Sequence, residues 1–151
     1  MAVAVERTIV TKGKSYGHHD EGILDTAAYP GMHIQLAADG HYDPSSQTAA
    51  ELIKRPLKIL KEDSLQGKTV NDQYAIGDLG MFYEPLPGDE ILAYVKSGEN
   101  IAVGDMLVQE GGGTGLFIEA AGTESIYRLE SQMSTAGALG ANGLVKCKVV
   151  R

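Results

Sequence analysis

The residues best suited to bind a metal ion are the neighbours His18-His19-Asp20. Imidazole nitrogens and carboxylate oxygens are common zinc ligands. Adjacent residues of an extended segment point to opposite sides, however, so both histidines cannot easily hold one ion. His33 and His41 would complete a ligand shell only if the N-terminal segment curled back on itself. We therefore expect a solvated polar loop here and no metal site.

A second candidate is Gln66-Gly67-Lys68-Thr69, which is similar to the end of a phosphate-binding loop. The full pattern needs another glycine five residues before Gly67, where this chain has Glu62, and Asp63 beside it would repel phosphate. The glycine-rich run at residues 111–115 lacks the strand–turn–helix setting of a dinucleotide site, so we expect a hairpin tip there. The sequence predicts no cofactor.

Candidate acids and nucleophiles do not form a catalytic pattern. Asp89 and Glu90, like Asp105 and Glu110, lie in predicted turns, where aspartate commonly bonds its own backbone. Ser97 lacks the flanking glycines of a nucleophile elbow. No stretch assembles a nucleophile, a base and an oxyanion donor. We expect no catalytic residue and no enzymatic activity.

Cys147 is the single cysteine of the chain. It lies in an alternating segment, residues 144–150, that places Lys146 and Lys148 on one strand face and Cys147 on the other. One cysteine cannot form an intrachain disulfide. We expect a buried core thiol rather than a nucleophile.

Composition points to a single acidic domain of 151 residues with a net charge of −7, 19 glycines and no tryptophan. This charge argues against binding to nucleic acid or to an anionic membrane. Residues 1–7 lack the basic start and apolar run of a secretion signal. No segment approaches the roughly 20 apolar residues of a spanning helix. We expect a protein made in the cytoplasm.

The elements that would position these residues are mainly short strands separated by glycine turns. The predicted strands cover residues 57–61, 80–83, 91–95, 101–103, 106–108, 116–120, 126–130 and 144–150. This spacing is typical of an all-β barrel or sandwich. The predicted structural turns contain Gly77, Gly88, Gly98 and Gly104, because glycine accepts positive φ at little cost.

The N-terminal third lacks the regular strand pattern of the rest of the chain. Repeated glycines and prolines interrupt every possible run, so residues 1–55 predict an extended arm and connector, and residues 56–151 a compact β domain. Within the arm we expect short strands at residues 8–11 and 32–36. The best helix candidate covers residues 47–54 and is closed by Pro56.

Residues 95–107 are similar to the half-motif of biotinyl and lipoyl carrier domains, which present a modified lysine at a hairpin tip. Here Lys96 lies at a predicted strand end, and no suitable lysine hairpin follows it. A non-catalytic carrier or ligand-binding barrel remains the alternative interpretation.

Four segments in this order resemble the small head-decoration, or capsid cement, proteins of tailed bacteriophages. They are residues 57–63, 65–78, 87–91 and 98–105, and the likeness extends over about residues 56–151. Its motifs are turns of a fold rather than catalytic signatures.

The resemblance implies a structural virion protein on the outer surface of an icosahedral capsid. Its partner would be the phage major capsid protein, whose neighbouring copies it would cement against the pressure of packaged DNA. It further implies a homo-oligomer, first a trimer and second a dimer. An acidic chain suits the outer face, away from DNA.

Five apolar or amphipathic side chains of the predicted arm are the candidate contacts with capsid or sister subunit: Tyr16, Tyr29, Met32, Ile34 and Tyr42. The arm is too irregular to bury them by itself. The alternative is that they fold back over the chain's own barrel.

Overall fold

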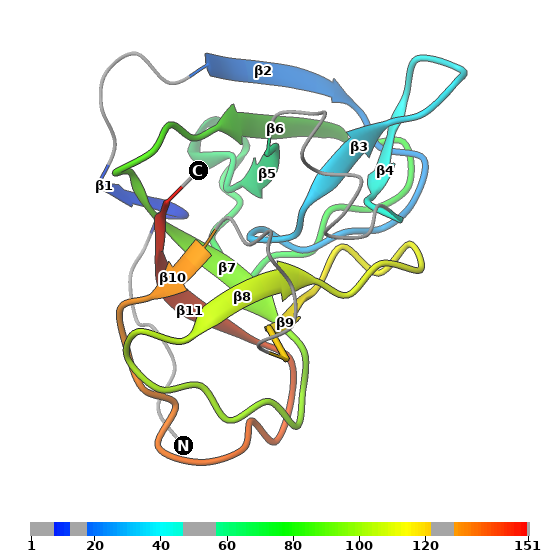
Figure 1. Cartoon of the computed structure of the whole chain (residues 1–151). Coiled ribbons are helices and arrows are strands. Elements are labelled where there is room, and N and C mark those ends of the chain that lie inside the picture. Colours follow the sequence, from blue (N-terminus) through cyan, green and yellow to red (C-terminus); the bar gives the residue numbers. More distant parts are fainter. Residues whose placement is uncertain (1–7, 13–17, 47–56, 122–128, 151) are drawn as a thin grey trace.

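The computed structural model describes residues 8–12, 18–46, 57–121 and 129–150, and their regular structure consists almost entirely of short β-strands (Figure 1). The strands are β1 (Val10–Lys12), β2 (His18–Ile23), β3 (Ile34–Leu36), β4 (Tyr42–Pro44), β5 (Ile59–Lys61), β6 (Leu79–Glu84), β7 (Glu90–Val95), β8 (Met106–Gln109), β9 (Phe117–Glu119), β10 (Leu129–Ser131) and β11 (Gly143–Val149). A 3-10 helix, η2 (Ser64–Gln66), follows β5. Within these ranges no helix is long and apolar enough to cross a membrane. The predicted all-β class is confirmed.

Five of the strands close into a barrel. β7 pairs antiparallel with β11, β11 with β10, β10 with β8, and β8 with β9. A parallel pairing between Val95 and Phe117 then joins β9 back to β7 and closes the ring. β1 adds to the start of β7 as a further strand of the same sheet. Closure removes the unpaired edges that an open sheet would leave.

A second layer lies over one side of the barrel (Figure 1). It contains the three-stranded sheet β2-β6-β5 and the two-stranded sheet β3-β4. Because successive side chains of a strand point to opposite faces, β5 serves both layers. Ile59 packs into the barrel interior, while Leu60 packs between the sheet and β3-β4.

The buried apolar side chains accordingly form two clusters. The barrel core includes Ile9, Ile91, Val95, Leu107, Phe117, Leu129, Val145 and Cys147. The second core consists of Leu24, Ala28, Ile34, Tyr42, Leu60, Tyr74 and Phe82. Cys147 is fully buried, as the alternation of β11 predicts, and burial raises the pKa of its thiol.

A buried hydrogen bond fixes the corner between the two layers. The hydroxyl of Tyr83 on β6 donates to Oδ2 of Asp89, the residue before β7, at 2.6 Å. The same oxygen accepts the backbone N–H of Leu86 at 2.9 Å. Burial and the carboxylate of Asp89 raise the pKa of Tyr83, so the phenol stays protonated and remains a donor.

The N-terminal segment differs from the extended arm predicted for residues 1–55. β1 pairs with β7, β2 pairs with β6, and the backbone of residues 31–34 bonds to residues 58–60. Ile9 belongs to the barrel core and Leu24 to the second core. The described part of this segment is therefore integrated with the rest of the fold. The predicted helix at residues 47–54 lies outside the described residues.

Individual strands depart from prediction where the local pattern is weak. The sequence pattern predicts neither β2, which is polar, nor β4, which contains a proline. The strand expected at residues 101–103 is instead part of a turn, with Ile101 buried and Val103 exposed at its tip. Of the strand expected at residues 126–130, the described residues 129 and 130 belong to β10.

Candidate functional site

The predicted contact residues occupy different environments. Ile34 and Tyr42 place their side chains in the second core, which is the fold-back arrangement that the sequence left open. Met32 packs against the same core and is half-buried, and Tyr29 is half-buried against the barrel. Tyr16 lies outside the described residues. A contact with a partner therefore stays a prediction, with Tyr29 and Met32 the more accessible of the described candidates.

The predicted turn glycines all have positive φ. The angles are 86° at Gly77, 96° at Gly88, 89° at Gly98 and 91° at Gly104. L-residues with a side chain rarely adopt this conformation, which is why glycine occupies these positions.

In three of these turns an aspartate follows the glycine and closes the turn with its side chain. Its carboxylate accepts the backbone N–H of the residue three positions earlier, at 2.7–2.9 Å. The bonds run from Ala75 to Asp78, from Leu86 to Asp89 and from Ala102 to Asp105. The same local device therefore stabilises turns in both layers of the fold.

Two of the turns in the second layer each expose a large apolar side chain. Leu65, on η2, is 96% exposed, and Ile76, next to Gly77, is 72% exposed. An ion pair of 3.2 Å between Lys68 and Asp78 joins the two turns. Water-exposed leucine and isoleucine at neighbouring tips form a candidate contact surface, which we call the apolar tips.

A hollow of about 200 Å³ opens beside β7 and the start of β11, next to the connections β2–β3 and η2–β6. The rings of Tyr29 and Tyr94 stack along it with centroids 5.4 Å apart, and the amides of Asn71 and Asn142 lie at its rim. The rest of its lining is Val70, Gly143 and Leu144. No lining residue in the described part of the chain carries a charge at neutral pH.

Backbone hydrogen bonds hold the wall that contains Tyr29. The turn closes through a bond from the N–H of Met32 to the carbonyl of Tyr29 at 3.2 Å. Gly31 then accepts from the N–H of Tyr94 at 2.9 Å and donates to Leu60 at 2.8 Å. These bonds to β7 and β5 fix the turn that carries Tyr29 relative to Tyr94.

His41 belongs to the one cluster of possible metal ligands found among the described residues, with Asp25 and Asp39. Its Nδ1 lies 2.7 Å from Oδ1 of Asp25 and 4.0 Å from Oδ2 of Asp39. The hydrogen bond and charge of Asp25 raise the pKa of His41. Since a metal requires the deprotonated ring, this favours an ion pair over a ligand set.

The other described histidines do not join this cluster. His19 lies against the ring of Tyr83, with centroids 4.9 Å apart, and burial and the charge of Lys61 lower its pKa. His33 is buried, with Nδ1 in contact with Nε2 of Gln109. The side chain of His18 lies outside the described part.

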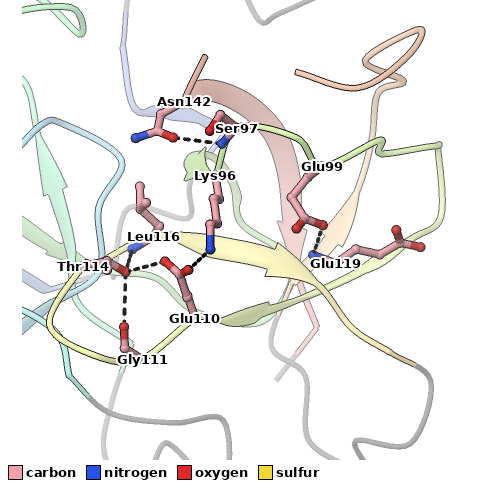
Figure 2. A network of polar contacts seen from close by, with 9 residues as sticks. All are labelled: Lys96, Ser97, Glu99, Glu110, Gly111, Thr114, Leu116, Glu119 and Asn142. Carbon is pink, nitrogen blue, oxygen red and sulfur yellow. Dashed lines mark hydrogen bonds and ion pairs between the residues drawn. The ribbon is translucent and has the colours of Figure 1, made fainter. Parts of the chain in front are cut away.

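Lys96, the residue that suggested a carrier domain, takes part in a polar network at the end of β7 (Figure 2). Its Nζ pairs with Oε1 of Glu110, and Oε2 of Glu110 accepts the hydroxyl of Thr114 at 2.9 Å. Glu110 and Thr114 flank the glycine-rich run, which forms a turn after β8. The network therefore joins Lys96 to the turn rather than presenting it at a hairpin tip.

Sequence reasoning missed most of the hollow. Tyr94, Asn71 and Asn142 come from three distant segments and share no motif. The sequence offered only weak indications of this site. Tyr94 places a polar hydroxyl in an apolar strand, and Asn142 comes directly before the start of β11.

No protein-family model matches the chain, and no curated protein matches its sequence. Among solved structures, it is similar to the head fiber gp8.5 N base of bacteriophage phi29, with a TM-score of 0.54 and 11% identity. The similarity covers 88% of this chain and 93% of that chain. At this identity the likeness establishes that the two chains share a fold over most of their lengths.

Proposed function

We propose that this protein is a non-catalytic structural component of a phage virion that binds the outer capsid surface and cements neighbouring major capsid proteins. The observation that carries the proposal is the fold shared with a phage head fiber base over most of both chains. The resemblance of the turn motifs in residues 56–151 to those of capsid cement proteins supports the same role.

The physical properties of the chain suit this role. A closed barrel, braced by a second layer, gives a rigid body that can resist deformation. A net charge of −7 suits the outside of a shell better than its DNA-filled interior. A homo-oligomer, with a trimer as the first expectation, would engage several capsid subunits at once and gain avidity.

The apolar tips are the contact surface that we favour. Ile34 and Tyr42 are buried, whereas Leu65 and Ile76 are among the most exposed large apolar side chains described. Burial of two such side chains against a partner is worth about 1.5–3 kcal/mol each before the costs of association.

Co-sedimentation of the purified protein with expanded and unexpanded capsid shells, together with its native mass, tests the proposal. We expect saturable binding to expanded shells at a fixed ratio to the major capsid protein. The double variant Leu65→Ser, Ile76→Ser should bind at least about tenfold more weakly, since each lost apolar contact is worth about that factor.

Val103→Ser is the matched control, because Val103 is also exposed at a turn but lies beside β10. It should bind like the unmodified protein. Full binding by the double variant would contradict the contact surface alone. A clean soluble oligomer that binds no shell would overturn the capsid role and favour the carrier or ligand-binding barrel.

A further inference from the structure

The hollow between Tyr29 and Tyr94 has the composition of a small-ligand site. Binding pockets typically combine aromatic and apolar walls with a few convergent polar groups. Here the tyrosine rings and the side chains of Val70 and Leu144 form the walls, and two asparagines lie at the rim. We propose that this hollow binds a neutral saccharide through one sugar ring.

The absence of charge in the lining defines the ligand class. Among the described residues that line the hollow, none is acidic, basic or a histidine. Burial and the neighbouring Tyr29 raise the pKa of Tyr94, so the Tyr94 phenol stays neutral at physiological pH. Phosphates, carboxylates and metal ions would find no counter-charge here, whereas a neutral polyol would need none.

The polar groups match sugar hydroxyls, which both donate and accept hydrogen bonds. Oδ1 of Asn142 accepts the backbone N–H of Ser97 at 2.8 Å, which turns the amide so that Nδ2 is left to donate elsewhere (Figure 2). The amide of Asn71 and the tyrosine hydroxyls can each donate and accept. The rings supply an apolar wall for the C–H face of a sugar.

Size favours a single ring over a peptide segment. The hollow of about 200 Å³ lies below the roughly 300–1,000 Å³ of sites for drug-sized ligands. Its walls are fixed by the bonds of Gly31 to Tyr94 and Leu60, so a ligand would meet a preformed surface.

The test is an amide NMR titration of the full chain with a panel of methyl glycosides of neutral hexoses and N-acetylhexosamines. We expect at least one to give saturable shifts centred on residues 71, 94 and 142–144. Asn71→Ala should weaken that binding about tenfold, because one lost hydrogen bond is worth about this factor. Asn71 is exposed, and no other described residue bonds its side chain, so this variant should keep the fold.

Asn100→Ala, at another exposed asparagine outside the hollow, is the control and should bind like the unmodified protein. Tyr29→Phe should weaken binding while it keeps the ring wall. The absence of saturable shifts with every glycoside, or equal affinity of the Asn71→Ala variant, would overturn the proposal. So would a capsid-derived peptide that shifts these residues when no glycoside does. The titration needs no capsid shell, so its outcome is separate from that of the proposed function.

Discussion

At the scale of single residues, the histidines show how tertiary neighbours decide chemistry. Three described histidines lie in different surroundings: His19 beside Lys61, His33 in the interior and His41 between carboxylates. His41 joins the tip between β3 and β4 to Asp25, just after β2. This contact ties two parts of the second layer together at an exposed position.

The His41 pair predicts a pH-dependent attachment of the β3-β4 tip. The pKa of His41 is raised from its usual 6.5 by Asp25, so its stabilisation is complete below about pH 6.5 and is lost as pH rises through the raised value. An NMR titration of the imidazole signals should place His41 above His19, whose pKa is lowered. Asp25→Asn should shift His41 downward and leave His19 unchanged. Equal titration of His41 in both proteins would contradict the ion pair.

At the scale of elements, the fold repeats one turn design. Glycine with positive φ occupies the third position, and in three turns an aspartate closes it. The turn at residues 29–32 uses the same position for Gly31, with φ of 93°, but presses it against the barrel. A Cβ there would lie 2.6 Å from Cδ2 of Leu144 and 3.1 Å from backbone atoms of β7.

Two glycine substitutions separate backbone strain from steric overlap. Gly40→Ala meets open space at φ of 88° and should cost about 1–2 kcal/mol of stability from the left-handed conformation alone. Gly31→Ala adds the overlap with Leu144 and should lower the free energy of unfolding by about 1–3 kcal/mol more. Urea unfolding of both variants measures the difference. Equal losses of unfolding free energy in the two variants would show that Leu144 moves aside at little cost.

At the scale of the whole molecule, the described N-terminal segment belongs to the sheets and to both hydrophobic cores. Its strands pair with β7 and β6, and its apolar side chains enter both cores. Deleting it would therefore remove core residues as well as any capsid contact. Point substitutions are the sharper way to separate stability from binding.

A pair of leucine variants makes that separation. Leu24→Ala, at a fully buried position of the second core, should lower the free energy of unfolding by about 2–5 kcal/mol. Leu65→Ala, at a 96% exposed position, should change it by less than about 0.5 kcal/mol. Chemical denaturation of both proteins provides the values. An unchanged free energy of unfolding in the Leu24→Ala variant would contradict a stabilising role of Leu24 in the second core.

Much of the fold was predictable because its signals are local. The alternation of β11 identified a strand and the buried face of Cys147, and the turn glycines identified positions of positive φ. β2 was not predictable in this way, since its polar residues show no alternation and its pairing with β6 joins segments about sixty residues apart. The pairing of the described N-terminal strands with β7 and β6 depends on such long-range contacts too.

Local sequence patterns are enough to identify the all-β class, the turns and the acidic character, because each depends on a residue and its near neighbours. The hollow shared by Tyr29, Asn71, Tyr94 and Asn142 arises only when the chain folds, and so does the pairing of His41 with Asp25. These groupings depend on strand register, on barrel closure and on how the second layer packs. Such long-range geometry is a property of the whole chain, so no short segment encodes it.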